Sequence, residues 1–503
     1  MTSTQVQARE VAMDDDSELR SFGYEPQLNR SMGLWSSLSI SISCMCITAG
    51  IFTVFAYSLG TVGPVFIWTW PIVAVGQILV TLVLAELAGH MPLSGYAFQW
   101  TSRLQNSHYG WFVGWAGLMA FTPGFTGLNL GLAPILSNRL GIEITPTNMM
   151  LVAVALTVVQ MGINLAGVAI ASRINNIAAF TAELGLSIIL TLILLIVGFV
   201  TNPVQSIGFL GTSSAGGPDF TVAFLLSGLL GIWVLTGQEG AADLAEETQG
   251  ARRNVPRALL TSIVLSSVIG FFMIVALTIN IPDLDTVNSA PVPIVAVLES
   301  ALGSTGALIF EIVAMVALFA GGLANMAASS RLIFSLSRDR MLPGSAMLSR
   351  VSASHTPSAA ILVAASLSII LVVVGTLIAS STMALIVGMA SVGYYVVYGL
   401  TILAAILATR RGSLAGASTF SLGNWATPIR WIAFIWTVLV VVELTVPTAN
   451  QQTALMAGVF FLIAAAWYFL VLRRRLNSGE AGTPGSPAPV TPEPAVPEPA
   501  YSG

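Results

Sequence analysis

The sequence contains no lysine, only three histidines and two cysteines, and few charged side chains of any kind. Cysteine and histidine are too scarce to form a zinc site or a disulfide framework, so neither is predicted. The net charge is −4, and the one basic run is Arg473 to Arg475, so nucleic acid is not an expected partner. No phosphate-binding loop, catalytic Cys/His pair or ATP-binding motif is visible. We therefore expect neither an enzyme nor a primary pump, and no cofactor.

The scarcity of charge indicates contact with lipid. Charged residues make up 8% of the 503 residues and hydrophobic residues 55%, and the mean hydropathy is +0.85. A soluble protein covers its surface with roughly 25% charged residues. Much of the surface of this chain must therefore face a lipid bilayer, and the sequence predicts a polytopic membrane protein.

Twelve apolar runs have the length of about 20 residues that a helix needs to cross a hydrocarbon core ~30 Å thick. Open sheet edges cannot lie in lipid, and the runs are too long for barrel strands, so an all-α fold is predicted. The expected spans are 34–58, 64–88, 110–137, 148–169, 174–200, 221–248, 258–281, 306–336, 358–377, 382–408, 429–447 and 453–472.

The arginines indicate the orientation. With twelve spans and cytoplasmic termini, 18 of the 19 basic residues fall on the cytoplasmic side, and Arg139 falls outside. This is the bias expected of a protein in the plasma membrane of a cell. The predicted regions are a disordered cytoplasmic head (1–33), a ten-helix core (34–408), a cytoplasmic loop (409–428), helices 11 and 12 (429–472), and a disordered proline-rich tail (473–503).

Two spans look interrupted. The first contains the small residues Thr48, Ala49 and Gly50, and the sixth contains a polar, glycine-flanked stretch from Thr236 to Gly240. These are corresponding members of two five-helix halves, spans 1–5 and 6–10. Transporters with inverted repeats bind substrate where such broken helices free backbone groups at mid-membrane. Close helix packing is an alternative explanation for Gly50 alone.

An ordered set of short motifs resembles the amino acid–polyamine–organocation transporter superfamily, and especially its amino acid/choline branch. The motifs cover roughly residues 30–475 and include Thr48 to Phe52, Ala85 to Ala88, Met91 to Gly95, Thr236-Gly237, Leu244 to Thr248, Val255 to Ala258, Ser329 to Leu332 and Ser337 to Pro343. The chain departs from the family in two places. It has Thr48 where many relatives have glycine, and Gln238 where relatives carry an aromatic lid.

The resemblance implies a substrate site between the two breaks. Free N–H groups of Thr48, Ala49 and Gly50 would bind a carboxylate at the start of a half-helix. Carbonyls of Leu235 and Thr236, beside Gly237, would bind an ammonium, with Trp233 and Gln238 in the wall. An alternative is that Thr48 only bonds the carbonyl four residues back.

An ion must supply the energy for accumulation. Glu183 lies ~15 Å into span 5, where a lone charge costs about 2.5–3.5 kcal/mol, so we expect it to be the proton-linked group. A neutral Glu183 that bonds a neighbouring helix is the alternative. Ser329 and Ser330 could instead complete a sodium site. Nearer the cytoplasm, an inner gate or a static ion-pair network is expected from Glu86, Glu246, Glu247 and Arg331.

The sequence thus favours a proton-coupled permease for an amino acid or related amine, which works by alternating access. Uptake of choline or a polyamine is an alternative, to which Glu239 would be suited. A non-transporting nutrient sensor on the same fold is a further alternative, although the head and tail carry no recognisable signalling module.

Overall fold

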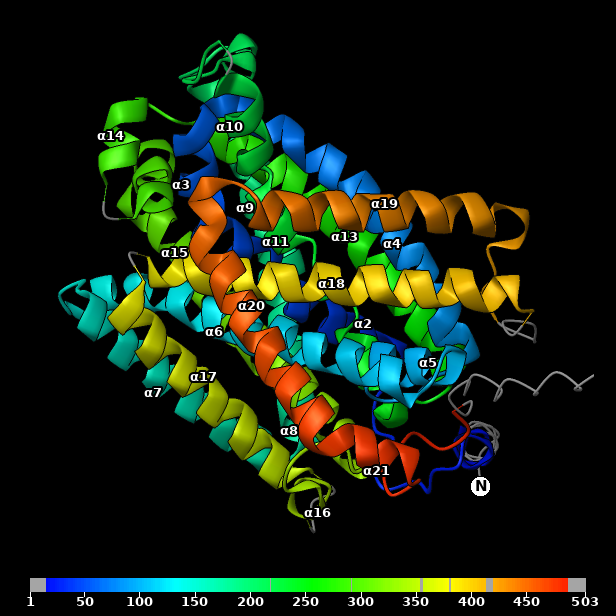
Figure 1. The fold of residues 1–503 in the computed structure, drawn as a ribbon. Coiled ribbons are helices and arrows are strands. Elements are labelled where there is room, and N and C mark those ends of the chain that lie inside the picture. The colour runs from blue at the N-terminus through cyan, green and yellow to red at the C-terminus, as the bar shows by residue number, and fades with distance from the viewer. Residues whose placement is uncertain are drawn as a thin grey trace, which may run out of the picture.

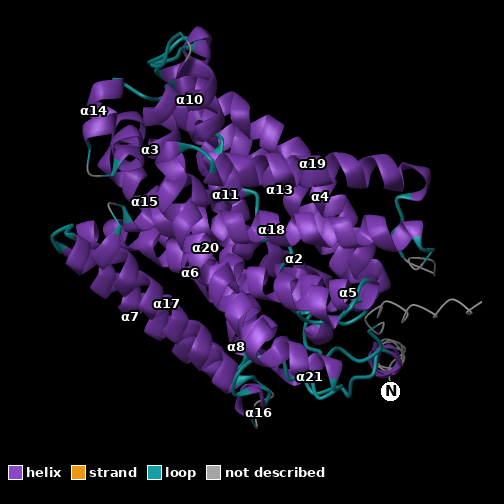
Figure 2. Ribbon diagram, in the orientation of Figure 1, coloured by secondary structure: helices purple, strands orange, loops and turns teal. Residues whose placement is uncertain are grey.

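A computed structural model describes residues 15–217, 219–290, 292–352, 356–379, 381–412 and 419–486. Within these ranges the chain is helical with connecting loops and has no strand, apart from an isolated bridge between Met32 and Thr248 (Figure 2). The longer helices are α2 (Leu34–Met45), α3 (Ile47–Val62), α4 (Thr69–His90), α5 (Tyr96–Leu104), α6 (Ser107–Leu140), α7 (Pro146–Ala166), α8 (Val168–Ile177), α9 (Ser187–Ile196), α10 (Asp219–Ser227), α13 (Ala251–Ile279), α15 (Pro293–Arg338), α17 (Ser358–Ile378), α18 (Thr382–Arg410), α19 (Ala426–Thr445) and α20 (Gln451–Trp467).

Shorter elements connect or extend these helices. They are α11 (Leu229–Val234), α12 (Gly240–Asp243), α14 (Leu284–Ser289), α16 (Ser345–Leu348), α21 (Arg473–Asn477), the 3-10 helices η1 (Pro64–Trp68), η4 (Ile207–Gly211), η5 (Ala245–Glu247), η6 (Gly423–Trp425) and η7 (Thr448–Asn450), and the π-helices η2 (Ala178–Leu186), η3 (Val197–Thr201) and η8 (Tyr468–Leu472).

Ten segments of the described chain are long and apolar enough to cross a membrane, which confirms the predicted all-helical membrane fold. They are Leu34–Val62, Pro64–His90, Pro146–Ala166, Ile170–Thr201, Ala251–Ile279, Pro293–Arg338, Ser358–Ile378, Thr382–Arg410, Gly423–Thr445 and Thr448–Asn477. Helix α6 and the shorter apolar segment Asp219–Val234 lie in the same bundle (Figure 1). They would bring the number to twelve, and that number stays a prediction.

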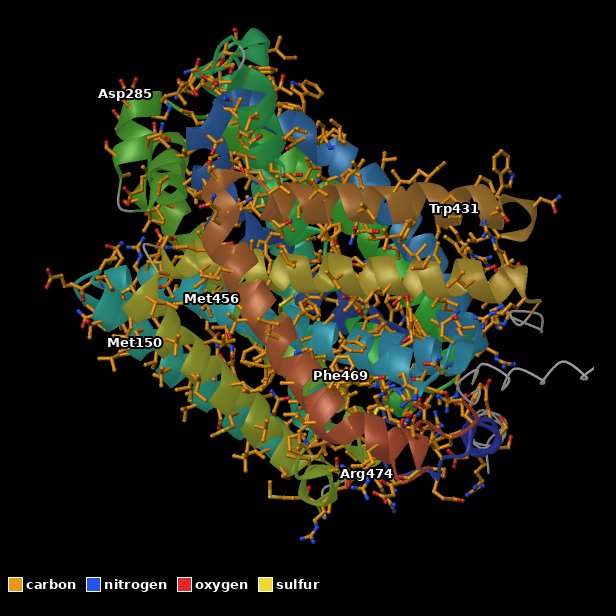
Figure 3. All side chains as sticks on the ribbon, viewed as in Figure 1. Met150, Asp285, Trp431, Met456, Phe469 and Arg474 are labelled. Carbon is orange, nitrogen blue, oxygen red and sulfur yellow. The ribbon has the colours of Figure 1, made fainter. Side chains whose placement is uncertain are left out.

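The outer helices present apolar side chains to the surroundings. Helix α17 packs beside α7, and α18 lies between α6 and α19 (Figure 1). Large exposed hydrophobic residues lie on α7, α17, α19 and α20 and on η8, where Leu470 is 82% exposed and Phe469 projects from the same segment (Figure 3). A soluble protein rarely exposes so much apolar surface. This surface is what a bilayer would cover.

The first span is broken slightly earlier than the sequence predicts. Helix α2 ends at Met45, and Cys46 has left-handed backbone angles, with φ 50° and ψ 63°. Residues Thr48 to Gly50, where unwinding was expected, form the first turn of α3. One left-handed residue is enough to end the first helix and restart the second, so the small residues are not themselves unwound.

The break in the sixth span is confirmed where it was predicted. Helix α11 ends at Val234, α12 starts at Gly240, and Gly237 between them has a φ of 95°. The two breaks face each other: a Cβ on Gly237 would lie 2.8 Å from the carbonyl oxygen of Cys44. The Ser41 hydroxyl also donates to the Gln238 carbonyl at 2.6 Å.

Span 5 is not the uninterrupted α-helix that the sequence suggested. Its middle, Ala178–Leu186, is a π-helix between α8 and α9, and Glu183 belongs to it. Such π segments are frequent at functional sites because they displace side chains from the regular helical positions.

The termini also differ from expectation. Residues 15–21 are helical, and the Tyr24 hydroxyl donates to Asp339 at 2.8 Å. From the other end of the chain, Thr483 donates to the same carboxylate at 2.8 Å. Residues 15–33 and 473–486 are therefore ordered against one end of the bundle, which we call the termini end. Residues 1–14 and 487–503 of the head and tail lie outside the described residues.

The loop predicted at 409–428 is shorter in the structure. Helix α18 continues to Arg410, η6 occupies Gly423–Trp425, and α19 begins at Ala426. Residues 413–418 of this loop lie outside the described residues.

Close packing of α18 on α6 predicts that Gly393→Ala destabilises the protein. The added Cβ would lie 2.5 Å from the backbone nitrogen of Ala120, which cannot move as a side-chain end can. We expect a loss of about 1–3 kcal/mol, measured as a lower thermal midpoint in detergent. Gly458→Ala on α20 is the control, because no atom lies within 4 Å of its added Cβ. Equal midpoints for the two variants would contradict this packing.

Candidate substrate and coupling site

The carboxylate of Glu183 lies at the start of the half-helix α3. The first intrahelical bond of α3 joins the Gly50 N–H to the Cys46 carbonyl at 2.7 Å, so the preceding N–H groups have no acceptor in the helix. The Thr48 N–H donates to Glu183 Oε2 at 3.2 Å, and the Thr48 hydroxyl donates to the same oxygen at 2.9 Å. This hydroxyl does not bond the carbonyl four residues back. A protein carboxylate thus occupies the position expected for that of the substrate.

The neighbours of this carboxylate come from three spans. Ser187, one turn beyond Glu183, lies 2.8 Å from the Thr48 hydroxyl. The Cys46 thiol donates to the Ala317 carbonyl of α15 at 3.1 Å. Sequence reasoning missed Ser187, although its spacing of four residues from Glu183 on a helix could have indicated it. The side chain of Ala49 lies outside the described residues, and its backbone belongs to the first turn of α3.

At the sixth break, backbone acceptors are free. The carbonyls of Leu235 and Thr236 accept no hydrogen bond from any described residue, since the nearest backbone bonds run from Leu235 N–H to Gly231 and from Gly240 N–H to Gly237. The Thr236 hydroxyl donates a hydrogen bond to the Trp233 carbonyl at 2.7 Å. The role of the two free carbonyls as acceptors for a substrate ammonium stays a prediction.

Trp233 and Gln238 point in different directions. The Trp233 ring is buried near Gly127 of α6. The Gln238 amide donates to the Thr81 hydroxyl of α4 at 3.1 Å, and its Oε1 has no partner among the described residues. Gln238 is therefore anchored toward α4.

Ser329 and Ser330 do not lie beside Glu183. The part of α15 that touches the first break is near Gly321, where an added Cβ would lie 2.7 Å from the Cys46 sulfur. Ser329 lies eight residues further along the helix, or about 12 Å. It contacts the Thr122 hydroxyl at 3.0 Å, and Ser330 accepts from Arg331 at 3.1 Å. The structure does not bring these serines together with Glu183.

The four residues assigned to an inner gate belong to three different ion pairs. Arg331 Nε bonds Glu247 Oε1 at 2.7 Å, and both side chains are about 1% exposed. Glu246 pairs with Arg338 at 2.9 Å. Glu86 pairs instead with Arg430 of α19 at 2.5 Å, a partner that sequence reasoning missed. These pairs lie near the termini end of the bundle, since Arg338 is next to Asp339.

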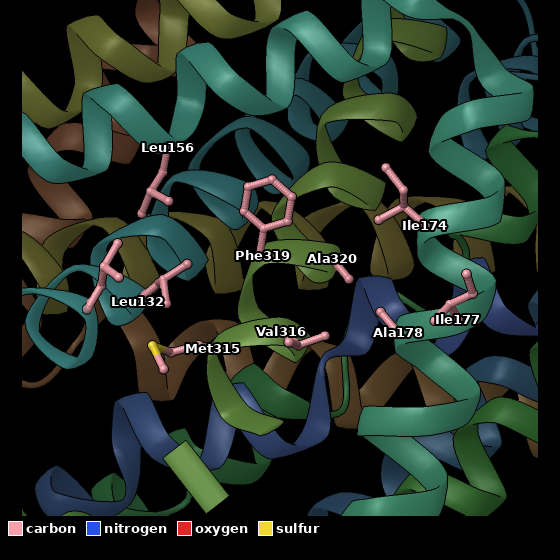
Figure 4. Close-up of a pocket in the computed structure, with 10 residues that line it drawn as sticks. Leu132, Leu156, Ile174, Ile177, Ala178, Met315, Val316, Phe319 and Ala320 are labelled. Atoms are coloured by element: carbon pink, nitrogen blue, oxygen red, sulfur yellow. The ribbon is translucent and has the colours of Figure 1, made fainter. Parts of the chain in front are cut away.

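A separate cleft of about 460 Å³ lies between α6, α7, α8 and α15 (Figure 4). Its lining is almost entirely hydrocarbon, including Leu132, Leu156, Ile174 and Phe319. A zwitterionic substrate needs hydrogen-bonding partners for both charged groups. This cleft supplies none, so it is not the candidate substrate site.

The buried pair predicts a strong effect of removing one charge. Arg331→Gln leaves Glu247 buried without its cation, and we expect a loss of about 3–5 kcal/mol in stability. The double variant Arg331→Gln with Glu247→Gln should recover much of that loss, because no uncompensated charge remains. Thermal unfolding of the three proteins in detergent is the measurement. A double variant no more stable than the single one would contradict a simple buried ion pair.

The chain resembles known proteins over most of its length. The sequence profile of the amino acid permease family matches residues 32–470. The chain is 24% identical to "Amino-acid permease BAT1" of Arabidopsis thaliana, over 90% of this chain and 93% of that protein. It is 26% identical to "Amino-acid permease 2" of Neurospora crassa, over 90% and 87% of the two chains.

A solved structure shares the fold. The crystal structure of MhsT in complex with L-phenylalanine superposes with a TM-score of 0.59, at 13% sequence identity, over 81% of this chain and 98% of that one. This likeness shows the fold, and the match of the family profile over most of the sequence shows the family. The chain belongs to the amino acid permease family.

Proposed function

We propose that the protein is a secondary active transporter of an amino acid or related amine, coupled to protons, that works by alternating access in the plasma membrane with both termini in the cytoplasm. Membership of the amino acid permease family supports the substrate class. The observation on which the proposal mainly rests is the pair of facing helix breaks in spans 1 and 6. One break offers N–H groups and the other offers carbonyls, and an amino acid needs both.

The contact between Glu183 and Thr48 suggests how a proton is linked to the substrate. Ionised Glu183 accepts two hydrogen bonds at the positive end of α3. A proton on Glu183 removes the negative charge that this helix end attracts. The carboxylate of the substrate then takes over the freed N–H group, so that protonation and substrate binding favour each other. Ser329 and Ser330 are far from this contact, and this favours protons over sodium.

The inner ion pairs fit a closed gate at the termini end. Glu247 with Arg331, and Glu246 with Arg338, join the sixth span to α15 below the breaks. Separating the sixth span from α15 would open a route from the breaks to the termini end. For this to happen, water must replace the partners in these ion pairs.

The proposed function is tested by binding and uptake. The purified protein is screened by thermal shift against amino acids and amines, and compounds that raise the midpoint are then tested for uptake into proteoliposomes. We expect at least one amino acid to stabilise the protein and to be transported. Neither stabilisation nor uptake by any amino acid would overturn the proposal and would favour a sensor on the same fold.

Glu183→Gln is expected to separate coupling from binding. Glutamine keeps an acceptor for Thr48 but carries no titratable charge, so substrate binding and exchange should persist while accumulation driven by a pH gradient is lost. One proton moving down 100 mV supplies about 2.3 kcal/mol, or roughly 50-fold accumulation. The measurement is uptake into proteoliposomes with and without an imposed pH gradient.

Glu143→Gln serves as the matched control, because Glu143 lies exposed in a loop. It should accumulate substrate like the parent protein. If Glu183→Gln also accumulates substrate like the parent, the proton site lies elsewhere and Glu183 only fastens span 5 to span 1.

A further inference from the structure

Two acidic side chains, one at the last residue of the sixth break and one a helical turn beyond it, are fully buried. The Asp243 N–H donates to the Glu239 carbonyl at 3.1 Å, which places both side chains on one face of α12. Both residues are 0% exposed. Neither forms an ion pair within the described chain, and the sequence has no lysine to provide one. These acids differ from Glu86, Glu246 and Glu247, each of which has an arginine.

The two carboxylates differ in their hydrogen bonds. Glu239 accepts from the Tyr398 hydroxyl through both oxygens, at 2.9 and 2.8 Å. Neither oxygen of Asp243 has a partner among the described residues. A buried carboxylate without a partner is unfavourable, so this position has unused capacity for a hydrogen-bond donor or a positive charge.

A second, independent feature points to the same place. The Tyr96 hydroxyl of α5 is buried and also has no hydrogen-bond partner among the described residues. Its ring is connected through Phe121 and Tyr394 to Tyr398, which bonds Glu239. From the first span, the Cys44 sulfur approaches the backbone between the two acids: a Cβ on Gly240 would lie 2.6 Å from it.

These aromatic rings form a connected series that ends beside Glu239. Tyr96 packs on Phe121 with centroids 6.2 Å apart, Phe121 on Tyr394 at 5.5 Å, and Tyr394 on Tyr398 at 6.1 Å. Aromatic faces attract organic cations, and carboxylates beside them supply the charge. Within the described residues, no group of three or more metal-ligating side chains is present, which makes a metal ion the less suitable occupant.

We propose that Asp243 and Glu239, with Tyr96, bind the cationic end of the substrate side chain, either an ammonium or a guanidinium. This rests on the proposed function and narrows the substrate class to basic amino acids and diamines. The pair lies beside the free carbonyls of Leu235 and Thr236. The α-ammonium group would bind at those carbonyls, and the second cationic group would bind at Asp243.

Arginine and citrulline provide a matched test, because they have nearly the same shape and only arginine carries the side-chain charge. We expect the parent protein in proteoliposomes to take up labelled arginine at least tenfold faster than citrulline at equal concentration. Asp243→Asn should lower arginine uptake about tenfold and leave citrulline uptake unchanged. Asp285→Asn, in the short helix α14 at the opposite end of the bundle from Arg474 (Figure 3), is the control and should behave like the parent.

The outcomes separate this inference from the proposed function. If no amino acid binds or is transported, the proposed function fails. If the parent protein takes up citrulline as fast as arginine, or if Asp243→Asn lowers the uptake of both equally, the proposed cation site is wrong. The proposed transport function is not affected by that result. Should Asp243→Asn not fold, Tyr96→Phe decides: a selective loss of arginine uptake supports the site, and an unchanged ratio overturns it.

Discussion

In a bilayer, backbone groups released from a helix can be satisfied only by other parts of the protein, and the structure is arranged around that constraint. The breaks in spans 1 and 6 lie against each other, and Ser41 of span 1 satisfies the Gln238 carbonyl. Glu183, from span 5, satisfies the Thr48 N–H. Gly237 allows this approach, because a Cβ there would collide with the Cys44 carbonyl. The groups left over are those that a ligand would use.

Buried charge follows the same logic. The acids near the termini end, such as Glu247 and Glu86, each have an arginine within 2.7 Å, which offsets the cost of removing them from water. Asp243 has no such partner. Buried acids paired with arginine thus lie where helices pack together near the termini end, whereas an acid without such a partner lies next to the sixth break.

The terminal segments extend this pattern outside the core. The Arg338 guanidinium lies over the Tyr24 ring, with its central carbon 3.7 Å from the ring centroid. The Tyr24 hydroxyl also donates to Asp339. Thr483 reaches the same aspartate from the other end of the chain. A few such anchors are sufficient to order a polar segment, although its overall composition resembles that of a disordered one. The described parts of the head and tail thus contact the end of the bundle where these ion pairs lie.

The sequence by itself determined the class of the protein, the helical fold and the approximate position of both breaks. These features depend on local composition, namely apolar runs long enough for a bilayer and glycine with polar residues inside two of them. It also identified Glu183 and Thr48 as separate candidates. It did not show that they bind each other, that the first break falls at Cys46, or that span 5 contains a π-helix.

Only the tertiary structure decided which distant residues meet. Glu86 pairs with Arg430 across 344 positions of sequence, and Tyr398 reaches Glu239 across 159. No local pattern specifies such partners, because they depend on how helices far apart in the chain pack together. For the same reason, the sequence could not show that Asp243 has no partner among the described residues. Whether a residue has a partner depends on all the residues that surround it in space.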